Sequence, residues 1–147
     1  MKARTRARKR AVDLLYEADL RGLNRNETDP TTSLEAVIVE VLKERLAYPG
    51  HEAPLPQYAV DAAEGISAHL THIDEAISTY SHGWTLGRMP AVDRAILRLG
   101  TWEIMYNDEV PDAVAIDEAV AMATRISTDD SPAFINGLLD RIKTMKP

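Results

Sequence analysis

Cysteine is absent from this 147-residue chain, which excludes disulfide bonds and thiolate-bound metal sites. No apolar run approaches the about 18 residues that a membrane-spanning helix needs, and the N-terminus carries no apolar signal segment. Phosphate-binding glycine loops, dinucleotide fingerprints and nucleophile elbows are missing as well. We therefore expect a soluble, cytoplasmic binding protein that has no catalytic residue, is not an enzyme and uses no cofactor.

Histidine is scarce, with four residues in the chain. His69 and His72 are spaced one helical turn apart and Asp74 follows closely, which makes this the best metal-ligand grouping in the sequence. A stable zinc site needs three or four ligands, and two histidines on an amphipathic helix are more often surface residues. The sequence therefore predicts no metal site.

Negative charge is missing from the first ten residues. The net charge of the chain is −6, yet six of its first ten residues are basic and none is acidic. The basic residues are Lys2, Arg4, Arg6, Arg8, Lys9 and Arg10. The other 137 residues carry 11 basic and 23 acidic side chains, a net charge of −12. A polyanion would bind this basic arm, and a basic protein would bind the acidic body.

Strand patterns are also absent, because no stretch alternates between apolar and polar residues for long enough. Apolar residues instead recur with helical spacing along most of the chain, so the fold class is all-α, within one domain. The predicted helices are residues 1–22, ended by Gly22; a helix capped by Thr32 and Glu35 that stops before Pro49; 57–79, broken near Thr71; 91–106; a helix from Pro111; and a helix from Pro132.

Two of these helices have unusual compositions. The segment 91–106 is so apolar that we expect it to be the central core helix. Its few polar residues are Asp93, Arg94, Arg98, Thr101 and Glu103. The helix from Pro111 is rich in alanine, which lets neighbouring helices approach closely, so we expect packing on more than one side. These alanines are Ala113, Ala115, Ala119, Ala121 and Ala123.

The turn after this alanine-rich helix contains Asp129 and Asp130, which we interpret as caps and dipole partners of the last helix. On that helix Phe134 is about 90° from the centre of the buried stripe, so we expect it at the edge of the core. Arg141 lies seven residues on, along the same line. By residue type alone Phe134 is more often a seal of the core margin, but beside a cation it also forms a stacking surface.

The basic arm lies on the first predicted helix. Arg6 and Arg10 are one turn apart on one side, a spacing that places them against successive phosphates, and Asp13 continues the same line. Two alternatives remain open. If it does not bind a nucleic acid, the arm is either a solvated basic terminus or a set of arginines neutralised by the protein's own acids.

These residues together resemble the NusB family of bacterial transcription antitermination factors, over nearly the whole chain. The first helix is similar to the family's R-x-R-x-x-A-x-x-x-L-Y opening, and the segment from Val92 is similar to its central helix. The matching residues are Arg6-Ala7-Arg8, Ala11-Val12, Leu15-Tyr16, Val92 to Arg98 with Glu103, Val110-Pro111, Ala115 to Val120, Asp130-Ser131 and Phe134 to Asp140.

The resemblance implies about seven helices in two small bundles, forming a single NusB-like domain over residues 1–147. It also implies a function: with the ribosomal protein NusE, such proteins bind single-stranded boxA RNA of nascent ribosomal RNA transcripts. The complex joins other Nus factors and RNA polymerase, and it suppresses premature termination. No bond is made or broken by the protein itself.

The resemblance also carries residue roles. It implies RNA binding by the basic arm and by the last helix, and partner binding by Tyr16 and Asp93. The RNA-binding set is Lys2, Arg4, Arg6, Arg8, Lys9, Arg10, Asp130, Ser131, Phe134 and Arg141. From the residues alone, Tyr16 is more often a core tyrosine and Asp93 a helix cap. We expect Asp130→Asn to tighten RNA binding, and Asp93→Lys to weaken the NusE complex without loss of helicity.

Two other functions stay open. NusB-like helical domains also precede some rRNA methyltransferases, a possibility that applies if the chain is a fragment, since a methyl-donor domain needs roughly another 150 to 250 residues. A helical protein-interaction adaptor that never touches RNA is the third possibility. The sequence leaves open whether the protein is a monomer or a homodimer.

Overall fold

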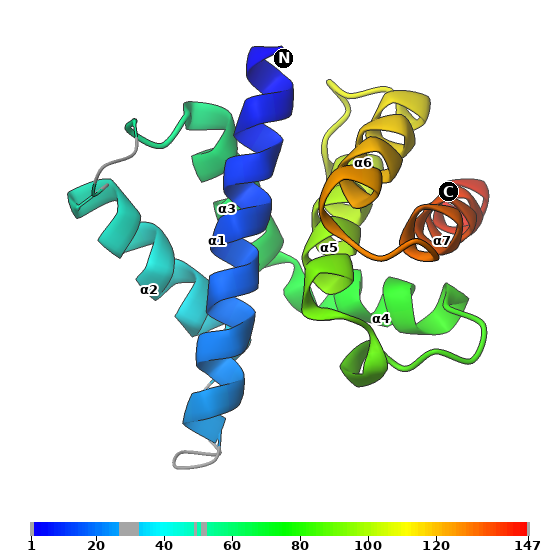
Figure 1. Cartoon of the computed structure of the whole chain (residues 1–147), viewed down its shortest axis with the longest axis horizontal. Helices are drawn as coiled ribbons and strands as arrows, with labels where there is room; N and C mark the ends of the chain where they lie inside the picture. The colour runs from blue at the N-terminus through cyan, green and yellow to red at the C-terminus, as the bar shows by residue number, and fades with distance from the viewer. Residues whose placement is uncertain (1, 27–32, 49, 51–52, 147) are drawn as a thin grey trace. The chain divides into compact units, whose positions relative to one another are not determined.

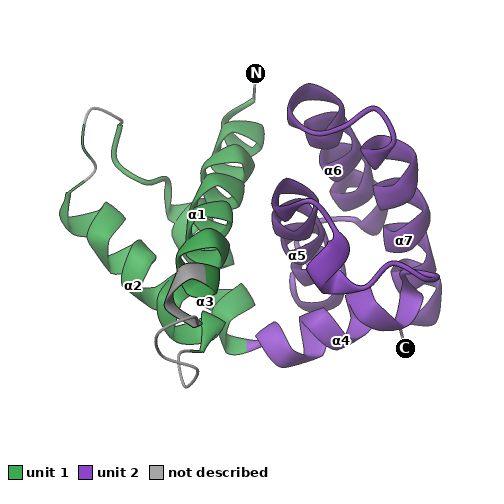
Figure 2. Ribbon diagram, turned by 60° about the horizontal axis from the view of Figure 1, so that its bottom comes forward, with its two compact units in different colours: residues 1–68 green, residues 69–147 purple. Residues whose placement is uncertain are grey.

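Seven α-helices and one short 3₁₀ helix form the regular structure, and none of the described residues is in a strand. The computed structural model describes residues 2–26, 33–48, 50 and 53–146 (Figure 1). The chain divides into two compact units, Met1–Ala68 and His69–Pro147 (Figure 2). The predicted all-α fold of seven helices in two small bundles is therefore confirmed.

The first unit contains α1 (Ala3–Asn26), α2 (Leu34–Ala47) and α3 (Gln57–Ala68), and each helix packs on the other two. Helical spacing of apolar residues predicts an inner face of α1 whose members are all buried: Ala7, Ala11, Leu14, Leu15 and Ala18. Because three of these five are alanines, the neighbouring helices can approach α1 closely.

Glycine at position 22 predicted the end of α1, but the helix does not end there. The helix continues to Asn26, and Gly22 is buried within it. A Cβ atom added at Gly22 would lie 3.6 Å from Cδ1 of Leu34, at the start of α2. An added Cβ would thus make ordinary van der Waals contact with α2, and this glycine lies inside a helix where it was expected to supply a left-handed stop.

The predicted capping box before α2 is replaced by a simple N-cap one residue later, because Ala36 at the third helical position has no side chain that could bond back. The N-cap is Ser33, whose Oγ accepts a hydrogen bond of 3.3 Å from the backbone N–H of Ala36. Thr32, the predicted cap, lies outside the described residues. Helical spacing predicts a buried face of Leu34, Val37, Ile38, Val41 and Leu42, and all of these are buried except Leu34, which is half-buried.

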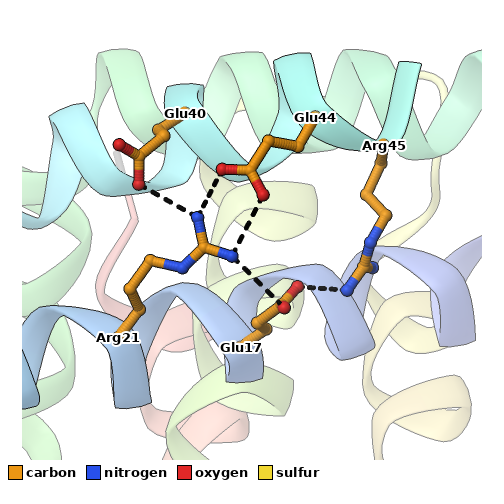
Figure 3. Close-up of polar contacts among 5 residues, drawn as sticks. All are labelled: Glu17, Arg21, Glu40, Glu44 and Arg45. Carbon is orange, nitrogen blue, oxygen red and sulfur yellow. Dashed lines mark hydrogen bonds and ion pairs between the residues drawn. The ribbon is translucent and has the colours of Figure 1, made fainter. Parts of the chain in front are cut away.

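A network of five charged side chains joins α1 to α2 (Figure 3). Arg21 donates hydrogen bonds to Glu44 at 2.6 Å and to Glu40 at 3.0 Å, and Glu17 accepts from both Arg21 and Arg45. The bonds to Glu44 and then Glu40 raise the pKa of Arg21 above its ordinary value. Because these side chains are partly exposed, the network adds orientation between the helices more than free energy.

The second unit contains α4 (Leu70–Tyr80), the 3₁₀ helix η1 (Leu86–Arg88), α5 (Ala91–Tyr106), α6 (Asp112–Ile126) and α7 (Ser131–Met145). The break before α4 falls at His69, two residues before the predicted position at Thr71. Helix α5 packs against α4, α6 and α7, so the prediction of a central core helix is confirmed.

All five polar residues of α5 that the sequence singled out are buried. Two arginines find partners on other segments of this unit. Arg94 donates to the carbonyl oxygens of Leu86 and Met89, and Arg98 forms two hydrogen bonds with the carboxylate of Asp74. These bonds offset the cost of burying charge, so a helix with charged residues can occupy the centre of the unit.

Helix α6 packs on both α5 and α7, as its alanine content predicted. Ala115, Ala119 and Ala123 are buried, whereas Ala113 and Ala121 are exposed and do not contribute to close packing. Gly100 on α5 continues this contact, because an added Cβ would lie 2.9 Å from Cδ1 of Leu139 and 3.7 Å from Cβ of Ala119. Helices α5 and α6 therefore contribute small residues at the point where the side chain of Leu139 from α7 packs.

Candidate nucleic-acid interface

The predicted basic arm is the first part of α1, and its six cations differ in exposure. Lys2, Arg4 and Arg6 are exposed. Arg8 is buried, with 3% of its surface exposed, and it lies 5.8 Å from the ring centroid of Tyr58. The arm therefore does not present all six charges outward, although the exposed ones lie at its N-terminal end.

Tyr58 of α3 holds the arm through its ring. The guanidinium carbon of Arg4 lies 3.9 Å from the ring centroid, a cation–π contact. This contact keeps the Arg4 side chain against α3 with its charge intact. Helical spacing of apolar residues in α3 predicts Tyr58 on the buried face, but the structure leaves it half-buried beneath these arginines.

Two further cations of the arm have partners within the same unit. Lys9 forms an ion pair with Asp13 at 2.7 Å, and Nη2 of Arg10 donates to the carbonyl oxygen of Ala53 at 2.9 Å. For Lys9, neutralisation by one of the protein's own acids is thus observed. The contact of Arg10 is with a backbone carbonyl rather than with a carboxylate.

In the second unit, the turn between α6 and α7 is fixed by hydroxyl groups. The Oγ atoms of Ser127 and Ser131 donate to the two carboxylate oxygens of Asp93, at 2.5 and 2.8 Å. Thr128 adds a hydroxyl contact of 2.7 Å to Ser131. Asp93 and Ser131 are both buried, so these bonds form inside the unit and set the path of the turn.

Asp130 is the N-cap residue of α7 but makes no side-chain capping bond. The interpretation of Asp130 as a hydrogen-bonding cap is therefore wrong. Its place at the helix start keeps it near the positive end of the helix dipole, and its carboxylate is exposed to solvent. The neighbouring Asp129 is exposed too.

Phe134 is half-buried at the edge of the core, as its angle to the buried stripe predicted. It also has an aromatic neighbour that the sequence did not reveal. The ring of Trp84 lies 5.1 Å from that of Phe134, centroid to centroid, with an angle of 40° between the planes. Trp84 lies in the loop before η1, and neither helical spacing nor a motif connects this loop with α7.

Arg141 follows Phe134 on the same side of α7. Its Nε donates a hydrogen bond of 2.8 Å to the carbonyl oxygen of Tyr80, the last residue of α4. Gly137 lies between the two, and an added Cβ there would lie 3.3 Å from Nη1 of Arg141. The glycine thus leaves room for the guanidinium close to the helix, beside the negative end of the α4 dipole.

The two predicted partner-binding residues lie in different units. Tyr16 is half-buried on α1, whereas Asp93 is 1% exposed in the first turn of α5. The residue-type alternative for Asp93, a helix cap, is wrong, because the N-cap of α5 is Pro90 and the carboxylate of Asp93 accepts from Ser127 and Ser131 instead. Its part in partner binding stays a prediction.

The histidine grouping has other partners in this unit. The ring of His69 stacks on Tyr106 at 3.9 Å, and Nδ1 of His72 lies 3.5 Å from the Tyr106 hydroxyl. Asp74 pairs with Arg98. Within the part of the chain that the structure describes, no three His, Cys, Asp or Glu residues come together to hold a metal ion. Nor is any described helix long and apolar enough to cross a membrane.

The fold and these surfaces define the class of protein: a small helical protein with a basic helix start and an aromatic edge. The sequence model of the NusB family matches residues 5–144. The chain therefore belongs to the NusB family, and the resemblance seen in the sequence is confirmed.

Individual relatives agree with this assignment. The chain is 53% identical over 147 residues to the transcription antitermination protein NusB of Beutenbergia cavernae. The alignment covers 100% of this chain and 93% of the relative. It is 47% identical to the protein of the same name from Nocardioides sp., over 100% of this chain and 98% of the relative. The antitermination function predicted for the family, rather than a methyltransferase domain, is thereby supported.

Solved structures confirm the fold. The structure of T. maritima NusB matches with a TM-score of 0.72 at 32% identity, over 99% of this chain and 94% of that chain. A structure of antitermination factors NusB and NusE in complex with double-stranded RNA matches with a TM-score of 0.70 at 23% identity. The match covers 97% of this chain and 98% of the matched chain. At that identity the second match concerns the fold alone.

Proposed function

We propose that this chain acts in transcription antitermination by binding single-stranded boxA RNA of nascent ribosomal RNA transcripts together with the ribosomal protein NusE. The observation that carries the proposal is the edge of α7, where half-buried Phe134 and Arg141 lie on one side of the helix beyond exposed Asp130. An aromatic ring beside a planar cation is the surface on which unpaired bases stack.

The first unit contributes attraction for phosphates. Lys2, Arg4 and Arg6 are exposed at the start of α1, and a cluster of cations on a helix binds the RNA backbone without reading its sequence. We therefore assign affinity to the arm and base recognition to the edge of α7. Ser131, whose hydroxyl is used inside the protein, supports the turn that carries Asp130.

The acidic residues after the arm suit a basic partner such as NusE, because ribosomal proteins are typically basic and opposite charges speed association. In this function the protein makes and breaks no bond. It assembles in the cytoplasm with NusE, other Nus factors and RNA polymerase, and its effect on termination comes from binding alone.

A binding titration tests the proposal. Fluorescent boxA-like RNA and a scrambled control of the same composition are titrated with the protein, with and without NusE, at several salt concentrations. Four phosphate contacts give a log-log salt slope of about −3 for single-stranded RNA. We expect tighter binding to boxA than to the scramble, and further tightening by NusE. Equal binding to both RNAs, unchanged by NusE, would leave only a helical adaptor with a basic terminus.

A further inference from the structure

The backbone of the loop that follows α4 is fixed at one aromatic residue, Trp84. His82 and Gly83 both have positive φ values, 49° and 96°, so the chain turns sharply just after the helix. The hydroxyl oxygen of Ser81, which is buried, lies 2.5 Å from the carbonyl oxygen of Trp84 and 3.2 Å from that of Ser78. This contact ties Trp84 to the end of α4.

The side chain held by this loop stays on the surface. Trp84 is 48% exposed although its ring meets Phe134. A tryptophan that served only to complete the core would bury most of its ring, because the apolar area of this side chain is large. A well-anchored but half-exposed ring is instead suited to receive another flat group.

Positive charge accompanies the two rings. Arg141 is bonded to the carbonyl oxygen of Tyr80, directly before the turn that carries Trp84, and Arg88 is exposed on η1 in the same loop. Aromatic rings with nearby guanidinium groups favour a ligand that is both planar and anionic. Single-stranded RNA has this combination, whereas an apolar peptide segment would leave the cations without a partner.

We infer that Trp84 is a second base-stacking residue, which works beside Phe134 on the bases of the bound single-stranded RNA. The inference rests on the proposed function and extends it from one ring on α7 to a pair of rings from two segments. Together, the rings of Trp84 and Phe134 stack on at least one base that Phe134 alone does not contact. The class of ligand is an unpaired nucleobase within an RNA strand.

Substitution of Trp84 tests the inference in the full-length protein with NusE present. Trp84→Leu keeps an apolar side chain and removes the ring, so we expect boxA affinity to fall about tenfold, as is typical of one lost stacking contact. Trp84→Phe restores a ring and recovers most of the affinity. Tyr48→Leu, which changes an aromatic residue that is 83% exposed in the other unit, is the matched control and keeps the wild-type affinity.

RNAs with a single abasic position identify the base. At one position, loss of the base should weaken binding to the wild type about tenfold but leave binding to Trp84→Leu unchanged, because the contact is already gone. Tryptophan fluorescence supplies a direct readout. RNA should quench the emission of the wild type but not that of Trp84→Phe, in which only Trp102 remains, and Trp102 is buried.

The outcomes separate this inference from the function on which it depends. If the wild type prefers boxA to the scramble but Trp84→Leu binds equally well and no fluorescence changes, Trp84 takes no base and the inference is overturned alone. If the wild type shows no preference for boxA even with NusE, the proposed function fails and the inference with it. Thermal unfolding of each variant verifies that the fold is intact.

Discussion

The hydroxyl of Ser131 donates a hydrogen bond of 2.8 Å to Oδ2 of Asp93, which ties the first turn of α7 to the first turn of α5. The family resemblance assigned these residues to different surfaces, Ser131 to RNA and Asp93 to the partner. In the structure they form one buried contact. A change to either residue therefore alters the turn that carries Asp129 and Asp130.

Ser131→Ala should destabilise the protein. The buried carboxylate of Asp93 loses one of its two hydroxyl donors, and a hydrogen bond to a charged group contributes about 1.5–3 kcal/mol to the free energy of unfolding. Urea and thermal unfolding measure the loss. Ser78→Ala, at an exposed position on α4, is the control and should leave stability unchanged. Equal stability of both variants would show that the Ser131 bond contributes nothing.

Asp93→Asn should weaken the complex with NusE while the helices persist. The structure changes the choice of variant, because a lysine at this buried site would lose both hydroxyl donors and cost about 3–5 kcal/mol of stability. With Asp93→Lys, a loss of stability would therefore be mixed with any loss of partner binding. Asparagine keeps the shape and removes a buried negative charge whose electrostatic field would attract a basic partner. We expect at least about fivefold weaker binding by calorimetry, or about 1 kcal/mol.

The control for this variant is circular dichroism of the free protein, which should match the wild type. Undiminished NusE binding by a folded Asp93→Asn protein would remove the charge of Asp93 from the interface. Its role would then be the structural one that its hydrogen bonds already describe.

Asp130→Asn should tighten RNA binding. The carboxylate is exposed at the start of α7 and makes no capping hydrogen bond, so its charge can be removed at little cost in stability. Repulsion between the carboxylate and RNA phosphates then disappears, and affinity should rise severalfold at low salt. Titration of labelled boxA RNA measures the change.

Asp129→Asn is the matched comparison, since it removes the same charge one residue away from an exposed position. Equal tightening by both variants would point to a general field effect rather than a specific place for Asp130. Weaker binding by Asp130→Asn would instead indicate that the carboxylate accepts a hydrogen bond from a base.

Lys2→Gln should weaken binding to every RNA by the same factor. Lys2 is exposed next to the start of α1, and a phosphate contact carries no sequence information. Loss of one contact should reduce the steepness of the log-log salt dependence by about 0.7. Lys43→Gln, an exposed lysine on α2, is the control. An unchanged slope for Lys2→Gln would exclude this lysine from the RNA contact.

Much of the fold could be predicted because helical spacing reports local burial. The bounds of α5 and the buried stripes of α1, α2 and α7 follow from apolar periodicity alone. Gly22 was misinterpreted because a glycine that ends a helix and one that lies buried inside a helix look the same in sequence. Only the tertiary contact separates the two roles.

The candidate site was less predictable for the same reason. Phe134 and Arg141 share one helix, so their common side follows from spacing. Trp84 reaches Phe134 from a loop whose course depends on positive φ values at His82 and Gly83, which no periodic pattern encodes. The burial of Asp93 likewise depends on hydroxyl groups from a distant turn.

Asp74→Ala should destabilise the second unit strongly. Asp74 accepts bonds of 2.9 and 3.1 Å from Arg98, whose side chain is only 5% exposed, so the variant removes a carboxylate that pairs with a buried guanidinium. We expect a loss of about 3 kcal/mol in the free energy of unfolding, measured in urea. Asp13→Ala removes an acid from the more exposed pair with Lys9 and should cost less than about 1 kcal/mol. If Asp74→Leu combined with Arg98→Met recovers most of the stability, the loss in Asp74→Ala comes from the buried charge of Arg98. If the double variant does not recover it, the ion pair itself stabilises the contact between α4 and α5.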